Sequence, residues 1–301
     1  MMLDCAIIGG GPAGLNAALV LGRARRNIVL FDNGKPRNAV TQESHGFITR
    51  DGVSPAKFRE FAHEDLNKYP SIAIEDAEIV EIKRLSDTTF QLMARNGDIH
   101  TTKKVILATG LKETLPDVPN IHGYYGKSLF SCPYCDGWEL RDKPLIVLSE
   151  SKHAVHMAKT LSQWSKDLIV CTNGQSVIEE AEAQLLIKHG IRIIEERIKQ
   201  LHGNDGQLEQ VTFADGTKIE RSGGIVTTEL EQSHSFISSL GCDSTQNGGI
   251  LVDDFGRTTV EGVYAAGEAS NNGPSQLIIA AAHGSRAAAG VNSDLTMEVF
   301  Q

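Results

Sequence analysis

The residues with the clearest chemical potential in this sequence are two cysteines separated by two residues. Cys132 and Cys135 stand in the segment Ser-Cys-Pro-Tyr-Cys-Asp-Gly, which covers residues 131–137. This spacing lets the two sulfur atoms meet, so the pair can cycle between dithiol and disulfide. A thiol at a helix N-terminus has a lowered pKa, and the carboxyl group of Asp136 is placed to carry protons during thiol exchange. The segment therefore predicts a redox-active disulfide.

A zinc site and an inert buried pair are the alternatives for these two cysteines. Structural zinc takes four ligands, usually from a second Cys-x-x-Cys pair or from two closely spaced histidines. The three other cysteines, Cys5, Cys171 and Cys242, are isolated from one another and lie on or near apolar stretches, which is typical of small core residues. We therefore expect no metal ligands. An odd count of five cysteines also argues against a secreted disulfide framework.

A glycine-rich segment near the N-terminus is the second motif with chemical content. Residues 9–14 read Gly-Gly-Gly-Pro-Ala-Gly and fit the pattern Gly-x-Gly-x-x-Gly between an expected strand and an expected helix. Gly9 permits the tight turn, Gly11 lets a pyrophosphate approach the backbone, and Gly14 lets helix and strand pack closely. The helix N-terminus offers N–H groups and the positive end of its dipole to phosphates. Asp32 ends the next strand, where a carboxylate accepts hydrogen bonds from ribose hydroxyl groups. The dinucleotide-binding residues predicted here are Gly9, Gly11, Pro12, Ala13, Gly14 and Asp32.

These segments stand at the ends of strands and helices that follow a repeated order. The expected elements of a first strand–helix–strand unit are 3–8, 13–24 and 28–32, and those of a second are 144–148, 153–164 and 168–172. Alternating segments at 77–83, at 88–94 and over 191–219 predict meanders, and further expected elements are strands 104–110, 250–253 and 262–266 and a small-residue helix 275–290. Such units bind nucleotides, so the sequence predicts an α/β protein with two Rossmann-like domains of three layers.

Composition limits the classes of partner and the compartment. The 301 residues are enough for two domains, and the net charge of -9 argues against nucleic acid or an anionic membrane as a partner. No apolar run approaches the ~20 residues needed to span a bilayer. The first apolar stretch begins almost at Met1 with no basic leader, so we expect no signal peptide and a cytoplasmic protein.

Four segments together resemble the low-molecular-weight thioredoxin reductases. They are residues 9–14, Ala-Thr-Gly at 108–110, the cysteine segment, and Gly267-Glu268. The form Cys-Pro-x-Cys-Asp-Gly-x-Glu over 132–139 is most similar to the branch that contains the gliotoxin and holomycin dithiol oxidases. The resemblance implies an FAD/NAD(P)-disulfide reductase fold in which residues 1–115 and 244–301 bind FAD. It also implies that residues 116–243 form an inserted NAD(P)-binding-like domain, and that the protein is a homodimer.

The resemblance also implies roles for individual residues. Cys135 is expected to face the flavin, Cys132 to exchange with the substrate, and Asp136 to act as the acid. His45 lies in a loop that passes near the flavin ring in similar proteins, so it is a candidate base, with a locally hydrogen-bonded loop histidine as the alternative. Further expected flavin contacts are Asn38, Thr109, Gly110, Gly267, Glu268, Gln276 and Leu277. Glu268 is a departure, because the family usually has Asp there.

The second strand–helix–strand unit lacks the glycines that the family uses to bind NADPH. Where the family carries Gly-x-Gly-x-x-Ala, residues 149–154 read Ser-Glu-Ser-Lys-His-Ala. The side chains of Ser149 and Ser151 stand where a pyrophosphate approaches the backbone, and Glu150 brings a negative charge towards it. At ~4 Å and an effective dielectric constant of ~20, one such like-charge pair costs about 4 kcal/mol.

The site for the 2′-phosphate of NADPH is also missing. The family places His-Arg-Arg after the second strand of this unit, whereas residues 171–174 read Cys-Thr-Asn-Gly. We therefore expect no productive NADPH binding in the usual place. A divergent loop that still binds NADH or NADPH with help from Lys152 and His153 is the alternative.

The sequence thus predicts an FAD-dependent dithiol/disulfide oxidoreductase, with a thioredoxin-like protein or a small dithiol or disulfide as its substrate. Without NADPH, its electron partner would be dioxygen, in a dithiol oxidase, or ferredoxin or another carrier, in a reductase. Two alternatives stay open: NAD(P)H-dependent reduction of thioredoxin through a divergent loop, and a non-enzymatic redox sensor.

Overall fold

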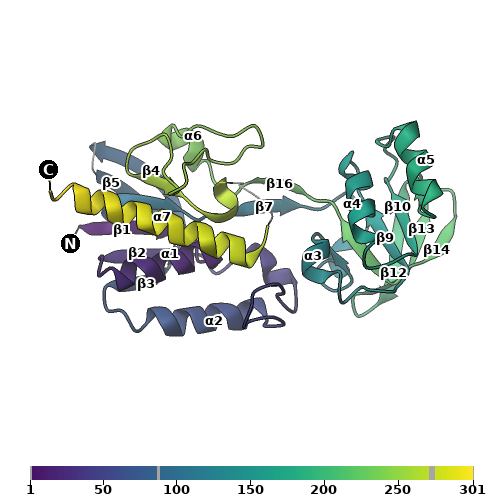
Figure 1. Cartoon of the computed structure of the whole chain (residues 1–301), viewed down its shortest axis with the longest axis horizontal. Helices are drawn as coiled ribbons and strands as arrows, with labels where there is room; N and C mark the ends of the chain where they lie inside the picture. The colour runs from purple at the N-terminus through teal and green to yellow at the C-terminus, as the bar shows by residue number, and fades with distance from the viewer. Residues whose placement is uncertain (1, 87–88, 271–274, 301) are drawn as a thin grey trace. The chain divides into compact units, whose positions relative to one another are not determined.

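The computed structural model describes residues 2–86, 89–270 and 275–300 and divides into two compact units (Figure 1). Unit 1 contains Met1–Ala39, Gly46–Lys112 and Glu231–Gln301, and unit 2 contains Val40–His45 and Glu113–Leu230. Residues 231–243, expected in the central domain, lie in unit 1 because the helix α6 (Phe236–Leu240) buries Phe236 in the core of that unit. The short strands β7 (Leu111–Thr114) and β16 (Glu229–Gln232) pair where the chain passes between the units.

The sheet of unit 1 combines a parallel part with a meander. Its order is β3-β2-β1-β6-β5-β4, and β17 also pairs with β6. The strands are β1 (Leu3–Ile8), β2 (Ile28–Asp32), β3 (Ile72–Asp76), β4 (Ile79–Ser86), β5 (Thr89–Ala94), β6 (Ile99–Leu107) and β17 (Val263–Ala265). The strands β1, β2, β3, β6 and β17 pair in parallel, so their carboxyl ends meet at one edge. That edge is where a doubly wound sheet binds its ligand.

Helices cover the parallel part of this sheet. They are α1 (Pro12–Arg23), α2 (Pro55–Leu66) and α7 (Leu277–Met297), and single-turn helices lie at η1 (Arg37–Val40) and η3 (Gly267–Ser270). Figure 1 shows α7, in yellow, lying along α1, and both helices bury small and aliphatic side chains in one core that includes Leu15, Leu21 and Val291. A second core, which includes Phe90, lies against the other face of the sheet.

Unit 2 repeats the doubly wound plan on a smaller scale. A parallel sheet has the order β11-β10-β9-β15-β8, and β12, β13 and β14 form a separate antiparallel sheet. The strands are β8 (Leu129–Phe130), β9 (Leu145–Leu148), β10 (Leu168–Cys171), β11 (Arg192–Ile194), β12 (Ile198–Asn204), β13 (Gln207–Phe213), β14 (Lys218–Glu220) and β15 (Gly223–Val226). The helices are η2 (Ile121–Gly123), α3 (Pro133–Asp136), α4 (His153–Leu161) and α5 (Glu180–Lys188). The predicted α/β architecture with two Rossmann-like sheets is confirmed.

One predicted element is absent. Residues 250–253, expected as a strand, contribute only an isolated bridge between Ile250 and Ser244. The backbone N–H of Ile250 donates to Ala269 and that of Leu251 donates to Asp243, so this segment is held by loop contacts and not by a sheet ladder. The apolar residues that suggested a strand are explained by the burial of Ile250 in the second core of unit 1.

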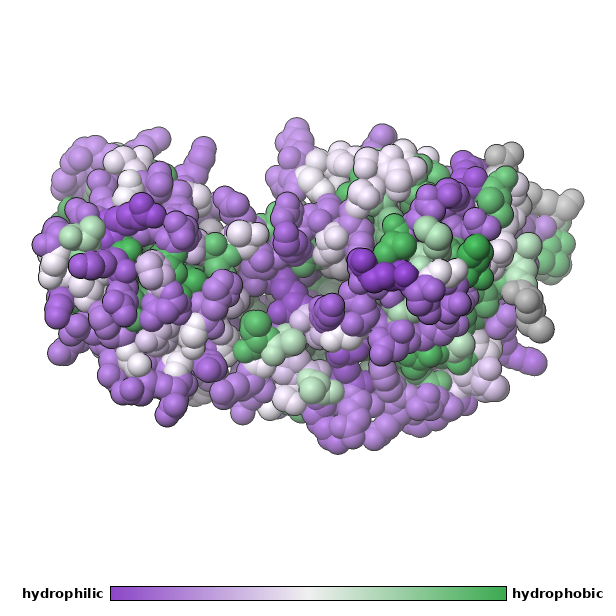
Figure 2. Space-filling model, turned by 180° about the vertical axis from the view of Figure 1, so that it is seen from behind, coloured by the Kyte–Doolittle hydropathy of each residue, from purple (hydrophilic) through white to green (hydrophobic). Residues whose placement is uncertain are grey.

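Hydrophilic residues cover most of the face seen in Figure 2, and the hydrophobic residues there stand in scattered groups. Among the described residues, no helix combines the length and the apolar character that crossing a membrane requires.

Candidate functional site

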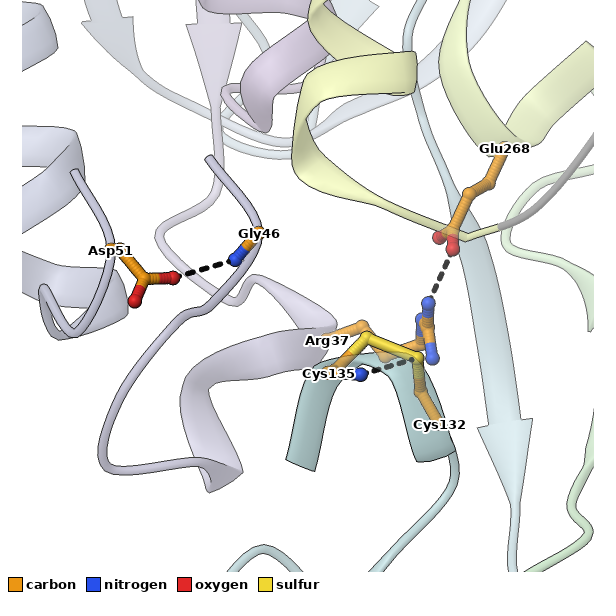
Figure 3. Close-up of a disulfide and its surroundings, with 6 residues drawn as sticks. All are labelled: Arg37, Gly46, Asp51, Cys132, Cys135 and Glu268. Atoms are coloured by element: carbon orange, nitrogen blue, oxygen red, sulfur yellow. Dashed lines mark hydrogen bonds and ion pairs between the residues drawn. A yellow bond between two sulfur atoms is a disulfide. The ribbon is translucent and has the colours of Figure 1, made fainter. Parts of the chain in front are cut away.

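The two cysteines of the predicted redox pair form a disulfide at the start of α3 (Figure 3). Cys132 is the N-cap residue of this helix, and the backbone N–H of Cys135 donates to Cys132 Sγ at 3.2 Å. A hydrogen bond to a sulfur favours its anionic form, so after reduction this N–H stabilises a thiolate on Cys132. Both cysteines are partly exposed, whereas Cys5, Cys171 and Cys242 are buried thiols.

Aromatic side chains surround the disulfide helix. Tyr134 and Trp138 are 68% and 64% exposed, and the ring of Tyr134 meets that of Trp164 edge to face at 5.5 Å between centroids. The guanidinium carbon of Arg141 lies 4.1 Å from the centroid of the Trp138 ring, in a cation–π contact. The cysteine pair is therefore presented on a short helix that is held by aromatic packing and is open to a partner.

Asp136 is the buried acid beside the disulfide. It directly follows Cys135, and its removal from water raises the pKa of its carboxyl group to about 7. The positive charge available on His45 opposes this rise, and the negative charge of Glu139 adds to it. A carboxylic acid with a pKa near neutrality can both donate and accept a proton under ordinary conditions.

His45 belongs to unit 2, in the same unit as the disulfide. Its Nε2 lies 3.5 Å from Glu43 Oε2 and 3.8 Å from Glu139 Oε1, and its side chain is 16% exposed. His45 and Glu139 both act on the charge of Asp136, so three titratable side chains form one group next to the cysteine pair. Among the described residues, no cluster of His, Cys, Asp and Glu side chains has the arrangement of a metal site.

The glycine loop of unit 1 leaves the N-terminus of α1 open. Gly9 has φ +111, a conformation that glycine adopts readily, and a Cβ on Gly14 would overlap the carbonyl oxygen of Gly9. A Cβ on Gly11 would meet no protein atom within 4 Å, and Gly11 caps α1 without any side-chain hydrogen bond. The space in front of Gly11, together with the N–H groups of the first turn that follow Pro12, beginning with Ala13, fits a pyrophosphate.

Asp32 lies against this loop from the end of β2. Its Oδ2 would overlap a Cβ on Gly10, its Oδ1 accepts from the backbone N–H of Gly34 at 3.1 Å, and its Oδ2 pairs with Arg59 of α2. The carboxylate is thus fixed beside the glycine loop, which is consistent with the predicted contact to a ribose hydroxyl group.

The remaining predicted flavin contacts lie around the same loop. A Cβ on Gly267 would stand 2.9 Å from Ala13 Cβ, so η3 packs on the first turn of α1. Glu268 of η3 pairs with Arg37 of η1 (Figure 3), and Asn38 follows Arg37 in the same turn. Thr109 and Gly110 follow β6, whose neighbour Ala108 lies against Gly9, and Gln276 and Leu277 begin α7. The predicted positions therefore come together at one edge of the sheet in unit 1, where the residues fit FAD.

Comparison with known proteins identifies the family of this chain. The model of the family described as pyridine nucleotide-disulphide oxidoreductase matches residues 3–284. The chain belongs to this family.

Several of its relatives are named as thioredoxin reductases. A probable thioredoxin reductase from Arthroderma benhamiae is 33% identical and covers 98% of this chain and 81% of its own length. Thioredoxin reductase aclD from Aspergillus oryzae is 32% identical and covers 99% of this chain and 98% of its own. The crystal structure of a putative thioredoxin reductase TrxB from Bacillus anthracis has a TM-score of 0.95 at 48% identity, covering 98% of this chain and 99% of its own. That of HlmI has a TM-score of 0.94 at 34% identity, covering 99% and 94%.

The chain is therefore a thioredoxin reductase-like flavoprotein, an FAD-dependent oxidoreductase that acts on disulfides. The suspected family and the FAD cofactor are confirmed. The roles assigned above to individual residues stay predictions, supported by where the structure places them.

Some residues of the two sites carried no signal in the sequence. Arg59 and Trp164 stand on elements far along the chain from Asp32 and the disulfide, and neither belongs to a motif. Glu139 stood in the cysteine motif, but its position near His45 depends on how residues 40–45 join unit 2. Only the folded chain brings these side chains to their partners.

Residues 149–154, which replace the glycine loop of unit 2, form hydrogen bonds with one another. Ser149, which follows β9, is fully buried, and its Oγ donates to the carbonyl oxygen of Ser151 at 3.3 Å. Ser151 Oγ accepts from the backbone N–H of His153 at 3.4 Å. This N–H lies in the first turn of α4, so a donor that a bound phosphate would use is already bonded within the loop.

Proposed function

We propose that this flavoprotein is a dithiol oxidase that works through Cys132 and Cys135 and takes no electrons from a pyridine nucleotide. The thiol chemistry rests on the buried acid Asp136, with a pKa of about 7, directly beside a disulfide whose Cys132 sulfur accepts a backbone hydrogen bond. This arrangement supplies the anion and the proton that thiol–disulfide exchange requires. The loss of the nucleotide rests on the loop after β9, in which Ser149, Ser151 and His153 hydrogen-bond to one another.

The exchange begins when a substrate thiolate attacks Cys132 Sγ. A bond forms between the substrate and Cys132, the Cys132–Cys135 bond breaks, and Cys135 leaves as a thiolate that takes a proton from Asp136. The second substrate thiol, deprotonated by the Asp136 carboxylate, then attacks the substrate sulfur of the mixed disulfide. The product disulfide is released, and Cys132 remains as a thiolate that the backbone N–H of Cys135 stabilises. The cysteine pair has gained two electrons, and Asp136 has regained a proton, taken from the second substrate thiol.

FAD, when bound in unit 1, supplies the two-electron acceptor for the reduced pair, and we propose dioxygen as the final acceptor. The overall reaction then balances as one dithiol and one dioxygen giving one disulfide and one hydrogen peroxide. Ferredoxin or another one-electron carrier is the competing partner, and it would serve a reductase that runs the exchange in the opposite direction.

The exposed aromatic side chains beside the disulfide support a substrate that reaches the pair from solvent. Tyr134 and Trp138 are exposed beside the disulfide and offer apolar area to a small dithiol or to a thioredoxin-like protein.

The thiols of Cys5, Cys171 and Cys242 are buried and form no disulfide, as in proteins of a reducing compartment, so we also propose a cytoplasmic location. We expect a homodimer, as the family resemblance implies.

The test is an anaerobic mixing experiment that follows the visible absorbance of the flavin. Dithiothreitol should bleach the flavin of the purified protein, whereas NADPH and NADH should not. Readmitted air should restore the colour and yield one hydrogen peroxide for each dithiol oxidised. Fast bleaching by NADPH would refute the proposal and favour an NADPH-dependent reductase. Slow reoxidation by air, accelerated by oxidised thioredoxin, would favour a reductase fed by another carrier, and failure of any dithiol to bleach the flavin would favour a redox sensor.

A further inference from the structure

A side-chain hydrogen bond joins the ends of two neighbouring strands in the parallel sheet of unit 2. In a doubly wound sheet, a dinucleotide lies across the carboxyl ends of the strands, between the loop after the first strand and the residue that ends the second. In unit 2 these two positions follow β9 and β10. Asn173, after β10, donates from Nδ2 to Oε1 of Glu150, after β9, at 2.6 Å. A direct hydrogen bond therefore joins the two positions between which a dinucleotide would lie.

The side-chain oxygen of Asn173 is also hydrogen-bonded. Its Oδ1 accepts from the backbone N–H of Ile198, the first residue of β12, at 2.9 Å. It is 5% exposed and has φ +52, in the left-handed region that Asn tolerates better than most residues. Both ends of the amide are used, so the amide orientation is set and the Glu150 carboxylate is held at its Nδ2.

No basic side chain at the end of β10 neutralises the negative charge of Glu150. Residues 171–174 contain no basic side chain, although Arg197 lies beside Gly174, with 3.8 Å between its Cβ and the position of an added Cβ there. The Arg197 guanidinium pairs with Asp117 at 3.2 Å. Lys152 and His153 are the remaining cationic candidates of the loop, and both are exposed.

We propose that Glu150, held by Asn173, excludes NADPH and NADH from unit 2, so that this domain carries the disulfide and no longer a nucleotide. The inference rests on the proposed function, because it explains how a member of this family loses the nucleotide. A dinucleotide bound between these two positions would have to break the Glu150–Asn173 bond and accept a carboxylate close to its own negative charges. At ~4 Å and an effective dielectric constant of ~20, this proximity weakens binding about a thousandfold. Since Glu150 is partly exposed, we expect a measured effect of about tenfold to a hundredfold.

The experiment measures nucleotide binding to the FAD-loaded, oxidised protein by titration calorimetry with NADPH and, separately, with NADH. Ser149→Gly with Ser151→Gly restores the glycine positions of the loop, and Glu150→Ala or Glu150→Gln is then added to that double variant. Glu220→Ala, at an exposed carboxylate on β14, is the control in the same background. Flavin content and circular dichroism show whether each variant folds.

The expected result is no measurable binding by the native protein, and binding by the triple variants that is about tenfold to a hundredfold tighter than that of the double variant. The Glu220 control should match the double variant. Equal affinities of the double and triple variants would overturn the proposed role of Glu150, and would leave the proposed function intact if the native protein still failed to bind. Tight NADPH binding by the native protein would overturn the proposed function itself. If the glycine variants do not fold, Glu150→Ala and Glu150→Gln in the native loop give the same comparison at higher nucleotide concentration, and no gain in affinity there would also overturn the role of Glu150.

Discussion

The Asp136→Asn variant tests the central physical claim about the disulfide site. Burial raises the pKa of Asp136 from the ordinary value of 3.8 to about 7 in the oxidised protein, with His45 opposing the rise and Glu139 adding to it. The difference between these two values corresponds to about 4 kcal/mol between the protonated and ionised states. Asn keeps the size of the side chain but cannot ionise, so the variant avoids this cost at high pH.

The direction in which stability changes with pH follows from proton binding by Asp136. Between about pH 4 and pH 7 the folded protein holds a proton on Asp136 that the unfolded chain has lost. The free energy of unfolding contributed by this group therefore falls as the pH rises through that range and is constant above it. At pH 4 to 5 the variant and the native protein should have similar stability. At pH 8 the variant should be more stable, by up to about 4 kcal/mol.

Tryptophan fluorescence during urea denaturation is a suitable assay, because both tryptophans of the chain, Trp138 and Trp164, lie in unit 2. The difference in unfolding free energy between Asp136→Asn and the native protein should grow from pH 5 to pH 8. Asp117→Asn removes a carboxylate in the same unit that is 94% exposed, and it should show no such pH dependence.

Neighbouring substitutions sharpen this prediction. Glu139→Gln removes a charge that raises the pKa of Asp136, so the pH dependence should move to lower pH, and His45→Gln should move it to higher pH. A stability difference between Asp136→Asn and the native protein that is the same at pH 5 and pH 8 would refute the claim that burial governs this carboxyl group.

Four further substitutions have distinct expected outcomes. Gly11→Ala should fold normally but bind FAD about tenfold to a hundredfold more weakly, as measured by flavin release on dilution, because its Cβ points into open space that the pyrophosphate needs. Gly14→Ala should instead lower the yield of folded protein, since its Cβ overlaps a backbone carbonyl, and normal folding would contradict the packing described. Asp294→Ala should reduce the free energy of unfolding by about 2–4 kcal/mol, measured by denaturation, because it leaves the hydroxyl group of buried Tyr264 and the guanidinium of Arg257 without their shared acceptor. Cys132→Ser should retain bound FAD and lose dithiol turnover, and retained turnover would contradict a disulfide mechanism.

Much of the fold was predictable because its signals are local. The strand β1, the glycine loop and α1 follow from a short apolar run, a tight turn and an Ala/Leu-rich helix within a few residues of one another. The apolar run at 250–253 misled the same reasoning, because burial of Ile250 does not require a sheet partner. The division of the chain into units also differed from the expected one, since a short helix such as α6 can pack on either side of a linker.

The sequence predicted the motifs of the flavin and disulfide sites, but not the side chains that surround those motifs in the folded protein. The residue types at 9–14 and at 132–137 carry their chemistry in their spacing, which makes the FAD cofactor and the redox pair predictable from them and the family resemblance. The partners Arg59 for Asp32 and Asn173 for Glu150 come from segments well separated along the chain. No local pattern selects them from the other arginines and asparagines.

The sequence by itself determined which atoms can react: two sulfurs that can meet, an acid next to them, and a helix start suited to phosphate. The tertiary structure decided the properties of those atoms. The pKa of Asp136 near neutrality depends on burial and on the charges of His45 and Glu139, and the Glu150–Asn173 bond depends on two segments that folding brings together. Spacing along the chain sets bonding geometry over a few residues, whereas desolvation and electrostatic energy sum over every atom that folding brings near, and this sum is absent from any short stretch of sequence.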